Sequence, residues 1–131
     1  MTGGRTNAAL TFEEVKTSGI SGYTGIILVG GEGAMTSLYD DLILRDLVRD
    51  FDQEGKIVSA ICASPVVLSR AGVLVGKQIT LFGDPISIEE VQTAGARVNE
   101  DPVVTDGRII TGNGPYAAVE FGKTVASALK G

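Results

Sequence analysis

Short apolar runs alternate with amphipathic segments along most of this chain. Two runs are mainly apolar, GIILVGG (25–31) and KIVSAI (56–61), and KQITLF (77–82) combines apolar and polar residues in a third predicted strand. Runs of this length and composition are typical of strands that are buried on both faces, as in a parallel sheet. A fourth segment, VVTDGRIIT (103–111), places Asp-Gly between two apolar stretches and predicts a β-hairpin.

Helical periodicity fills the intervals between these strands. Residues 35–54 repeat leucine, valine and phenylalanine every three or four positions and predict an amphipathic helix that ends before Gly55. Residues 64–72 predict a short helix, residues 87–95 a helix with Ser87 as its N-cap, and residues 117–131 a closing helix. Strands that alternate with helices predict a single α/β domain with a mostly parallel sheet over residues 1–131, in which residues 1–10 are a polar lead-in.

Composition narrows the functions to consider. The net charge is −5 and no segment concentrates lysine or arginine, so we expect neither a nucleic-acid nor a membrane partner. The chain has no histidine, which rules out Cys-His or Ser-His catalysis within it and removes the commonest zinc ligand. The acids, among them Glu89 and Glu90, are spread over helix faces where we expect them to be solvated, and we expect no metal and no cofactor. With no secretory signal pattern at the start and one cysteine, the expected location is the cytoplasm.

The single cysteine, Cys62, is the main candidate for chemistry, and two interpretations of it stay open. It stands between an apolar strand and a predicted helix, with the small neighbours Ala60, Ala63 and Ser64 that a nucleophile elbow requires. There the helix N-terminus would lower the pKa of the thiol, and the amides of Gly31 and Ala63 could form an oxyanion hole. On spacing alone, a small side chain buried in the core is the more common case.

Three stretches in unbroken order resemble the ThiJ/PfpI superfamily: YTGIILVGGEGA, GKIVSAICASPVVLSRAGVLVGKQIT and VVTDGRIITGNGPYAAVEF. That family includes the parkinsonism-associated protein, deglycases, glyoxalases and so-called intracellular proteases, and has a class I glutamine amidotransferase-like fold. The resemblance implies a flavodoxin-like three-layer sandwich with Cys62 as the elbow nucleophile and the amides of Gly31 and Ala63 as the oxyanion hole. It also implies a homodimer.

The chain departs from the family pattern at several positions. Ala63 follows the cysteine where some members have histidine, and Phe82 stands where histidine or tyrosine is usual. Val29 replaces the proline of Pro-Gly-Gly, and the loop at 111–115 lacks the family's arginine. Glu32 is a weak substitute for the family's acidic partner of the cysteine, with which no residue here aligns.

The resemblance also implies that the N-terminal third of the family domain, with its first strand and helix, is lacking. The strand at residues 26–29 would then have an open edge, which we expect either a second chain or a rearranged homodimer to cover.

The sequence thus favours a cysteine-dependent hydrolase or lyase of the glyoxalase or deglycase kind that acts on small reactive carbonyls. Two alternatives stay open: a non-catalytic redox-sensing, stress-sensing or interaction module, and an incomplete family domain with no activity of its own. Peptidase activity ranks below all of these.

Overall fold

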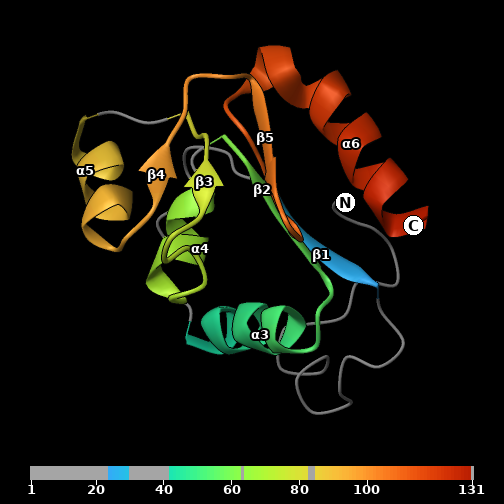
Figure 1. Ribbon diagram of the computed structural model, residues 1–131, viewed down its shortest axis with the longest axis horizontal. Coiled ribbons are helices and arrows are strands. Elements are labelled where there is room, and N and C mark those ends of the chain that lie inside the picture. Colours follow the sequence, from blue (N-terminus) through green and yellow to red (C-terminus); the bar gives the residue numbers. More distant parts are fainter. Residues whose placement is uncertain (1–23, 30–41, 63, 83–84, 131) are drawn as a thin grey trace.

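The computed structural model describes residues 24–29, 42–62, 64–82 and 85–130 (Figure 1). Within these residues the main sheet has four strands: β1 (Gly25–Val29), β2 (Ile57–Ile61), β6 (Ile109–Gly112) and β5 (Val103–Asp106), in that order. β1 pairs parallel with β2, and β2 pairs parallel with β6. Only β5 runs antiparallel to its neighbour β6. The predicted mostly parallel sheet is therefore confirmed, and among the described strands β1 lies at its edge.

β5 and β6 form the hairpin that the Asp-Gly pattern predicted. Asp106 pairs with Ile109, which leaves Gly107 and Arg108 as the two turn residues. Gly107 has φ +61°, and Arg108 is not among the residues with positive φ. This is the type II′ arrangement, which needs glycine only at the first turn position.

Beside this sheet, β3 (Gln78–Ile79) and β4 (Arg97–Val98) form a separate parallel pair. The strand expected over residues 77–82 is thus much shorter, and β4 was not expected at all. Thr80 shows why the strand ends early: its buried N–H donates to the Thr111 side chain, Oγ1, at 2.9 Å instead of to a neighbouring strand. The Thr111 side chain, and not a backbone ladder, therefore attaches Thr80 to β6.

In the described part of the chain, four helices lie around the sheet: α3 (Leu42–Gln53), α4 (Pro65–Arg70), α5 (Pro85–Thr93) and α6 (Ala118–Lys130). In Figure 1, α3 and α4 lie on one face of the sheet and α6 on the other, which gives the three layers of the expected sandwich. The first part of the expected helix over 35–54 lies outside the described residues.

The helix ends follow the predicted signals in part. Gly55 and Gly72, just past α3 and α4, have φ +73° and +81°, as expected of glycines that terminate helices. The predicted start of α5 is wrong: the helix begins at Pro85, so Ser87 lies inside it. Proline is favoured in the first helical turn because its missing N–H would be unpaired there in any case.

Two hydrophobic clusters fill the spaces between the layers. The α3–α4 core packs between the sheet and helices α3, α4 and α5, and it consists of Leu28, Leu44, Leu47, Val48, Phe51, Val58, Ala60, Val66, Val67, Leu68, Ala71, Val73, Leu74, Ile79, Leu81, Val91, Ala96 and Ile109. The α6 core packs between the sheet and α6, and it consists of Ile57, Ile61, Ile110, Phe121 and Val125. Strand β2 contributes to both, which explains why all five of its residues are buried.

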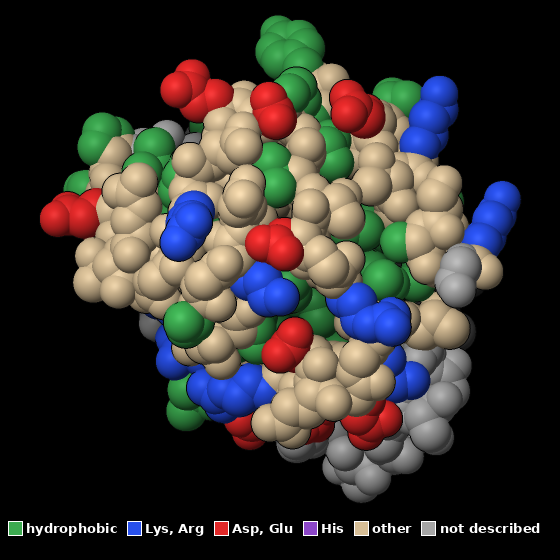
Figure 2. All heavy atoms as spheres, viewed as in Figure 1, with side chains coloured by type: hydrophobic (Ala, Val, Ile, Leu, Met, Phe, Trp, Pro, Cys, Tyr) green, Lys and Arg blue, Asp and Glu red, His purple; other side chains and the backbone are tan. Residues whose placement is uncertain are grey.

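The surface gives two further facts. On the face in Figure 2, acidic and basic side chains are interspersed between apolar ones. Among the described residues, no helix is long and apolar enough to cross a membrane.

Candidate active site around Cys62

Cys62 directly follows β2 and lies three residues before the start of α4. Its backbone has φ +65°, and it is the one residue other than glycine with a positive φ in the described part of the chain. The left-handed region brings Cβ too close to the following carbonyl oxygen, which costs roughly 1–2 kcal/mol. Such strain persists only where the surroundings enforce it, and it is concentrated at functional sites. The strand-turn-helix geometry expected of an elbow is therefore present at Cys62.

Two backbone hydrogen bonds hold Cys62 in this conformation. Its N–H donates to the carbonyl of Gly112 at 3.0 Å, and its carbonyl accepts from the N–H of Phe82 at 2.8 Å. The first bond continues the pairing of β2 with β6, whereas the second comes from the segment after β3. The backbone of Cys62 is thus hydrogen-bonded to two segments, at Gly112 and at Phe82, that lie far from it in the sequence.

The Ser64 side chain forms hydrogen bonds at the carboxyl end of β2. The Ile61 N–H donates to Ser64 Oγ at 3.0 Å. The one proton of this hydroxyl has two carbonyl acceptors within reach, Leu28 at 2.8 Å and Ile61 at 2.6 Å. Ser64 is fully buried and occupies the N-cap position of α4, yet it makes no side-chain cap. Its hydroxyl instead bridges β1 and β2 near their carboxyl ends.

The thiol lies on the α6 side of the sheet. Cys62 is half-buried and packs against the α6 core, which includes Ile61 and Phe121. Burial raises the pKa of the Cys62 thiol above its usual value, because apolar surroundings penalise the thiolate. The prediction of a lowered pKa is therefore wrong. The helix expected to lower it, α4, has only six residues.

The other predicted site residues are placed only in part. Gly31 and Ala63, the predicted oxyanion-hole residues, and Glu32 lie outside the described residues. Phe82 does lie beside the cysteine, as its bond to Cys62 shows.

Sequence reasoning missed the roles of Gly112 and Ser64. Gly112 packs closely between strand and helix, since a Cβ there would lie 3.0 Å from Phe121 Cδ1 and 3.1 Å from Ile61 Cγ1. A larger residue at this position would require these two side chains to shift.

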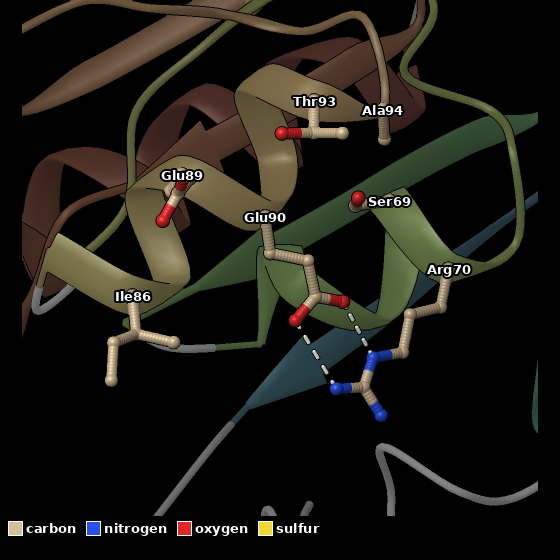
Figure 3. A pocket seen from close by; sticks show the side chains of 7 residues that line it. All are labelled: Ser69, Arg70, Ile86, Glu89, Glu90, Thr93 and Ala94. Atoms are coloured by element: carbon tan, nitrogen blue, oxygen red, sulfur yellow. Dashed lines mark hydrogen bonds and ion pairs between the residues drawn. The ribbon is translucent and has the colours of Figure 1, made fainter.

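A separate hollow of about 440 Å³ lies between α4 and α5 (Figure 3). Its lining residues are Ser69, Arg70, Ile86, Glu89, Glu90, Thr93 and Ala94. Arg70 Nε lies 2.7 Å from Glu90 Oε2, and Arg70 Nη2 lies 3.2 Å from Glu90 Oε1, so the pair is bidentate. The expectation that Glu90 is simply solvated is therefore wrong: it joins α4 to α5. Within the described segments, no three histidine, cysteine, aspartate or glutamate side chains are grouped as metal ligands would be.

Comparisons with known proteins agree with this fold. The model of the DJ-1/PfpI family matches residues 1–128. An uncharacterized protein of Methanocaldococcus jannaschii is 44% identical over 108 residues, covering 82% of this chain and 53% of that protein. The glutathione-independent glyoxalase DJR-1.2 of Caenorhabditis elegans is 31% identical over 107 residues, covering 81% of this chain and 55% of that protein.

Among solved structures, a ThiJ/PfpI domain protein from Brachyspira murdochii superimposes with a TM-score of 0.85 at 30% identity, covering 95% of this chain and 69% of that one. This likeness confirms the expected flavodoxin-like architecture. The chain spans about half the length of the curated relatives it matches. From the family match and the shared fold, the chain belongs to the DJ-1/PfpI family.

Proposed function

We propose that Cys62 is the nucleophile of a hydrolase or lyase that acts on small reactive aldehydes, in the manner of a glyoxalase or deglycase. The observation that carries this proposal is the left-handed backbone of Cys62 at the carboxyl end of β2, with φ +65°. In an open α/β sheet, ligands bind at the carboxyl ends of the strands. One relative in the same family bears the name of a glyoxalase, which gives this chemistry a precedent.

The proposed reaction begins with addition of the thiol to the aldehyde carbon. A bond forms between Sγ and the aldehyde carbon, the carbonyl π electrons move to its oxygen, and that oxygen takes up the thiol proton, so that a hemithioacetal results. With a neighbouring ketone, the C–H proton of the former aldehyde carbon moves to the ketone carbon and the hydroxyl proton of the hemithioacetal moves to the ketone oxygen, which yields a 2-hydroxy thioester. Water then hydrolyses the thioester to a hydroxy acid and restores the thiol. No external oxidant or reductant is needed.

The raised pKa of Cys62 shapes this mechanism. At neutral pH the resting group is the thiol, so a base must remove its proton as the S–C bond forms. Donors near the developing oxyanion would stabilise the adduct, and the amides of Gly31 and Ala63 remain our prediction for that role.

Turnover of methylglyoxal by the purified chain tests the proposal. Cys62→Ala should lower the rate by on the order of 10³-fold, because the nucleophile is lost. Cys62→Ser is the matched control, since it keeps a polar side chain of nearly the same size, and it should also be inactive while it unfolds at a similar temperature. Equal rates for the wild type and Cys62→Ala would reject the proposal that Cys62 is a catalytic nucleophile. The alternative of a redox-sensing thiol would then be tested by the mass of Cys62 after exposure to peroxide.

A second proposal concerns assembly through β1. Among the described residues, β1 pairs on one side only, with β2, and its Ile27 side chain is 47% exposed. The backbone groups that point away from β2 form a row that another strand can bind. We propose a second copy of this chain as the occupant, because antiparallel pairing of two identical edges is self-complementary.

Light scattering on the purified chain and two variants tests this assembly. The wild type should be dimeric, and Ile27→Lys should shift it toward the monomer because a lysine disfavours edge pairing. Ile86→Lys changes an exposed isoleucine on α5 and should leave the dimer intact. A monomeric wild type, or equal effects of the two variants, would contradict pairing through β1.

A further inference from the structure

Phe82 places an exposed apolar ring on a segment that is hydrogen-bonded to Cys62. Its side chain is 65% exposed, whereas the preceding Leu81 is 7% exposed and belongs to the α3–α4 core. The Phe82 N–H donates to the Cys62 carbonyl at 2.8 Å, so the ring is attached to the segment that carries the nucleophile. Other large apolar side chains are exposed elsewhere on the surface, but among these described residues only Phe82 forms a backbone hydrogen bond with Cys62.

The ring also lies against the loop that follows β6. A Cβ on Gly114 would lie 3.5 Å from Phe82 Cδ1 and 3.9 Å from Cγ, which is van der Waals contact with the ring. Gly114 is two residues beyond Gly112, whose carbonyl accepts the Cys62 N–H. The two segments that hydrogen-bond to the Cys62 backbone, one at Phe82 and one at Gly112, are therefore in contact at the Phe82 ring. One side of the ring is covered by Gly114, and a large part of the rest stays open.

This loop carries a second exposed aromatic residue. Tyr116, within the short helix η1 (Pro115–Ala117), is fully exposed to solvent. An apolar group that covers an exposed ring is stabilised by the area removed from water, and aromatic pairs gain further from edge-to-face or offset stacking. A ring of this kind next to a nucleophile favours substrates that place an apolar group beside the reacting carbon.

We propose that Phe82 is a specificity-determining residue that makes the Cys62 site select aldehydes bearing an aromatic or large apolar substituent over small ones such as methylglyoxal. The inference rests on the proposed function, since it assigns the substrate class of the same site. Phe82 acts through its side chain, because its bond to Cys62 is made by the backbone and survives substitution.

Two haloacetamides test the subsite without requiring turnover. Iodoacetamide and its N-phenyl derivative both form a bond from Cys62 Sγ to carbon and release iodide, and they differ in the aromatic group. The quantity measured by mass spectrometry is the ratio of the two alkylation rates, divided by the same ratio for a free thiol. This ratio cancels changes in the pKa of the thiol.

For the wild type we expect the N-phenyl reagent to be favoured by about 10-fold, the size of one modest apolar contact. Phe82→Ala should lower that preference at least five-fold, and Phe82→Leu should lower it less. Ile86→Ala, at an exposed residue on α5, should leave it unchanged. An equal ratio in wild type and Phe82→Ala would overturn the inference, as would a Cys62 that neither reagent modifies.

Turnover of phenylglyoxal and methylglyoxal then separates this inference from the proposed function. If neither compound is turned over but the alkylation ratio depends on Phe82, the proposed enzymatic activity is rejected and the aromatic subsite beside Cys62 is supported. If both are turned over with a rate ratio that Phe82→Ala does not change, the enzyme stands and the role of Phe82 is rejected.

Discussion

The two faces of the sheet differ in how they are built and in what they carry. The α3–α4 core joins three helices to β1, β2 and β6, whereas on the other face α6 buries only Phe121 and Val125 against the strands. Cys62 packs on the α6 side, and the fully buried Ser64 ties the strands together at the start of α4. The difference indicates that stability comes mainly from one face, while the candidate chemistry lies beside the smaller core.

Removal of the Ser64 hydroxyl should have the largest effect on this arrangement. Ser64→Ala leaves the Ile61 N–H and the Leu28 carbonyl without the partner that now bridges them. Two buried polar groups that lose a hydrogen-bond partner cost about 3 kcal/mol in total. Urea unfolding should show this loss, with Ser69→Ala in the same helix as the control. A loss below about 1 kcal/mol would mean that water or rearranged backbone replaces the hydroxyl.

A matched pair of valines compares the two faces directly. Val48 in α3 is fully buried in the α3–α4 core, and Val125 in α6 is 2% exposed in the α6 core. Val48→Ala should lower the free energy of unfolding by about 2 kcal/mol and Val125→Ala by about 1 kcal/mol, because the smaller core can collapse around the missing methyl groups. Urea unfolding measures both, and equal losses would remove the proposed difference between the faces.

We expect the smallest effect in the pH dependence of Cys62 alkylation. Since burial raises the pKa of the thiol, the rate should keep rising through pH 9, beyond the free-thiol value of about 8.5. The unfolded chain loses this proton first, so the native state loses stability as pH rises from the unfolded pKa toward the folded one. Cys62→Ser should show less of this alkaline loss than the wild type. A rate that levels off below pH 8 would show that the thiolate is stabilised.

Much of the fold could be predicted because its signals are local. The buried strands β1, β2 and β6 follow from apolar runs, and the ends of α3 and α4 follow from Gly55 and Gly72. The short β3 could not be predicted, because the Thr80 N–H bonds to a side chain 31 residues away. The start of α5 differs from the prediction because the capping pattern at Ser87 lies inside the helix, which begins at Pro85.

The site was predictable in position but not in its chemistry. The place of Cys62 between strand and helix follows from the apolar run before it and the helical pattern after it, and its role as a nucleophile from the resemblance to the family. The direction of its pKa depends on packing against α6, whose buried Phe121 is 59 positions further along the chain (121 − 62). The backbone hydrogen bonds from Cys62 to Gly112 and from Phe82 to Cys62 likewise join segments that no local sequence pattern connects.

The left-handed backbone of Cys62 has a consequence for laboratory evolution. Glycine adopts this conformation without a clash, so Cys62→Gly should raise the free energy of unfolding by up to about 1 kcal/mol. A screen for heat resistance would then enrich the very substitution that deletes the single thiol of the chain. Selection for a stable scaffold and selection for thiol reactivity would therefore drive position 62 toward different residues.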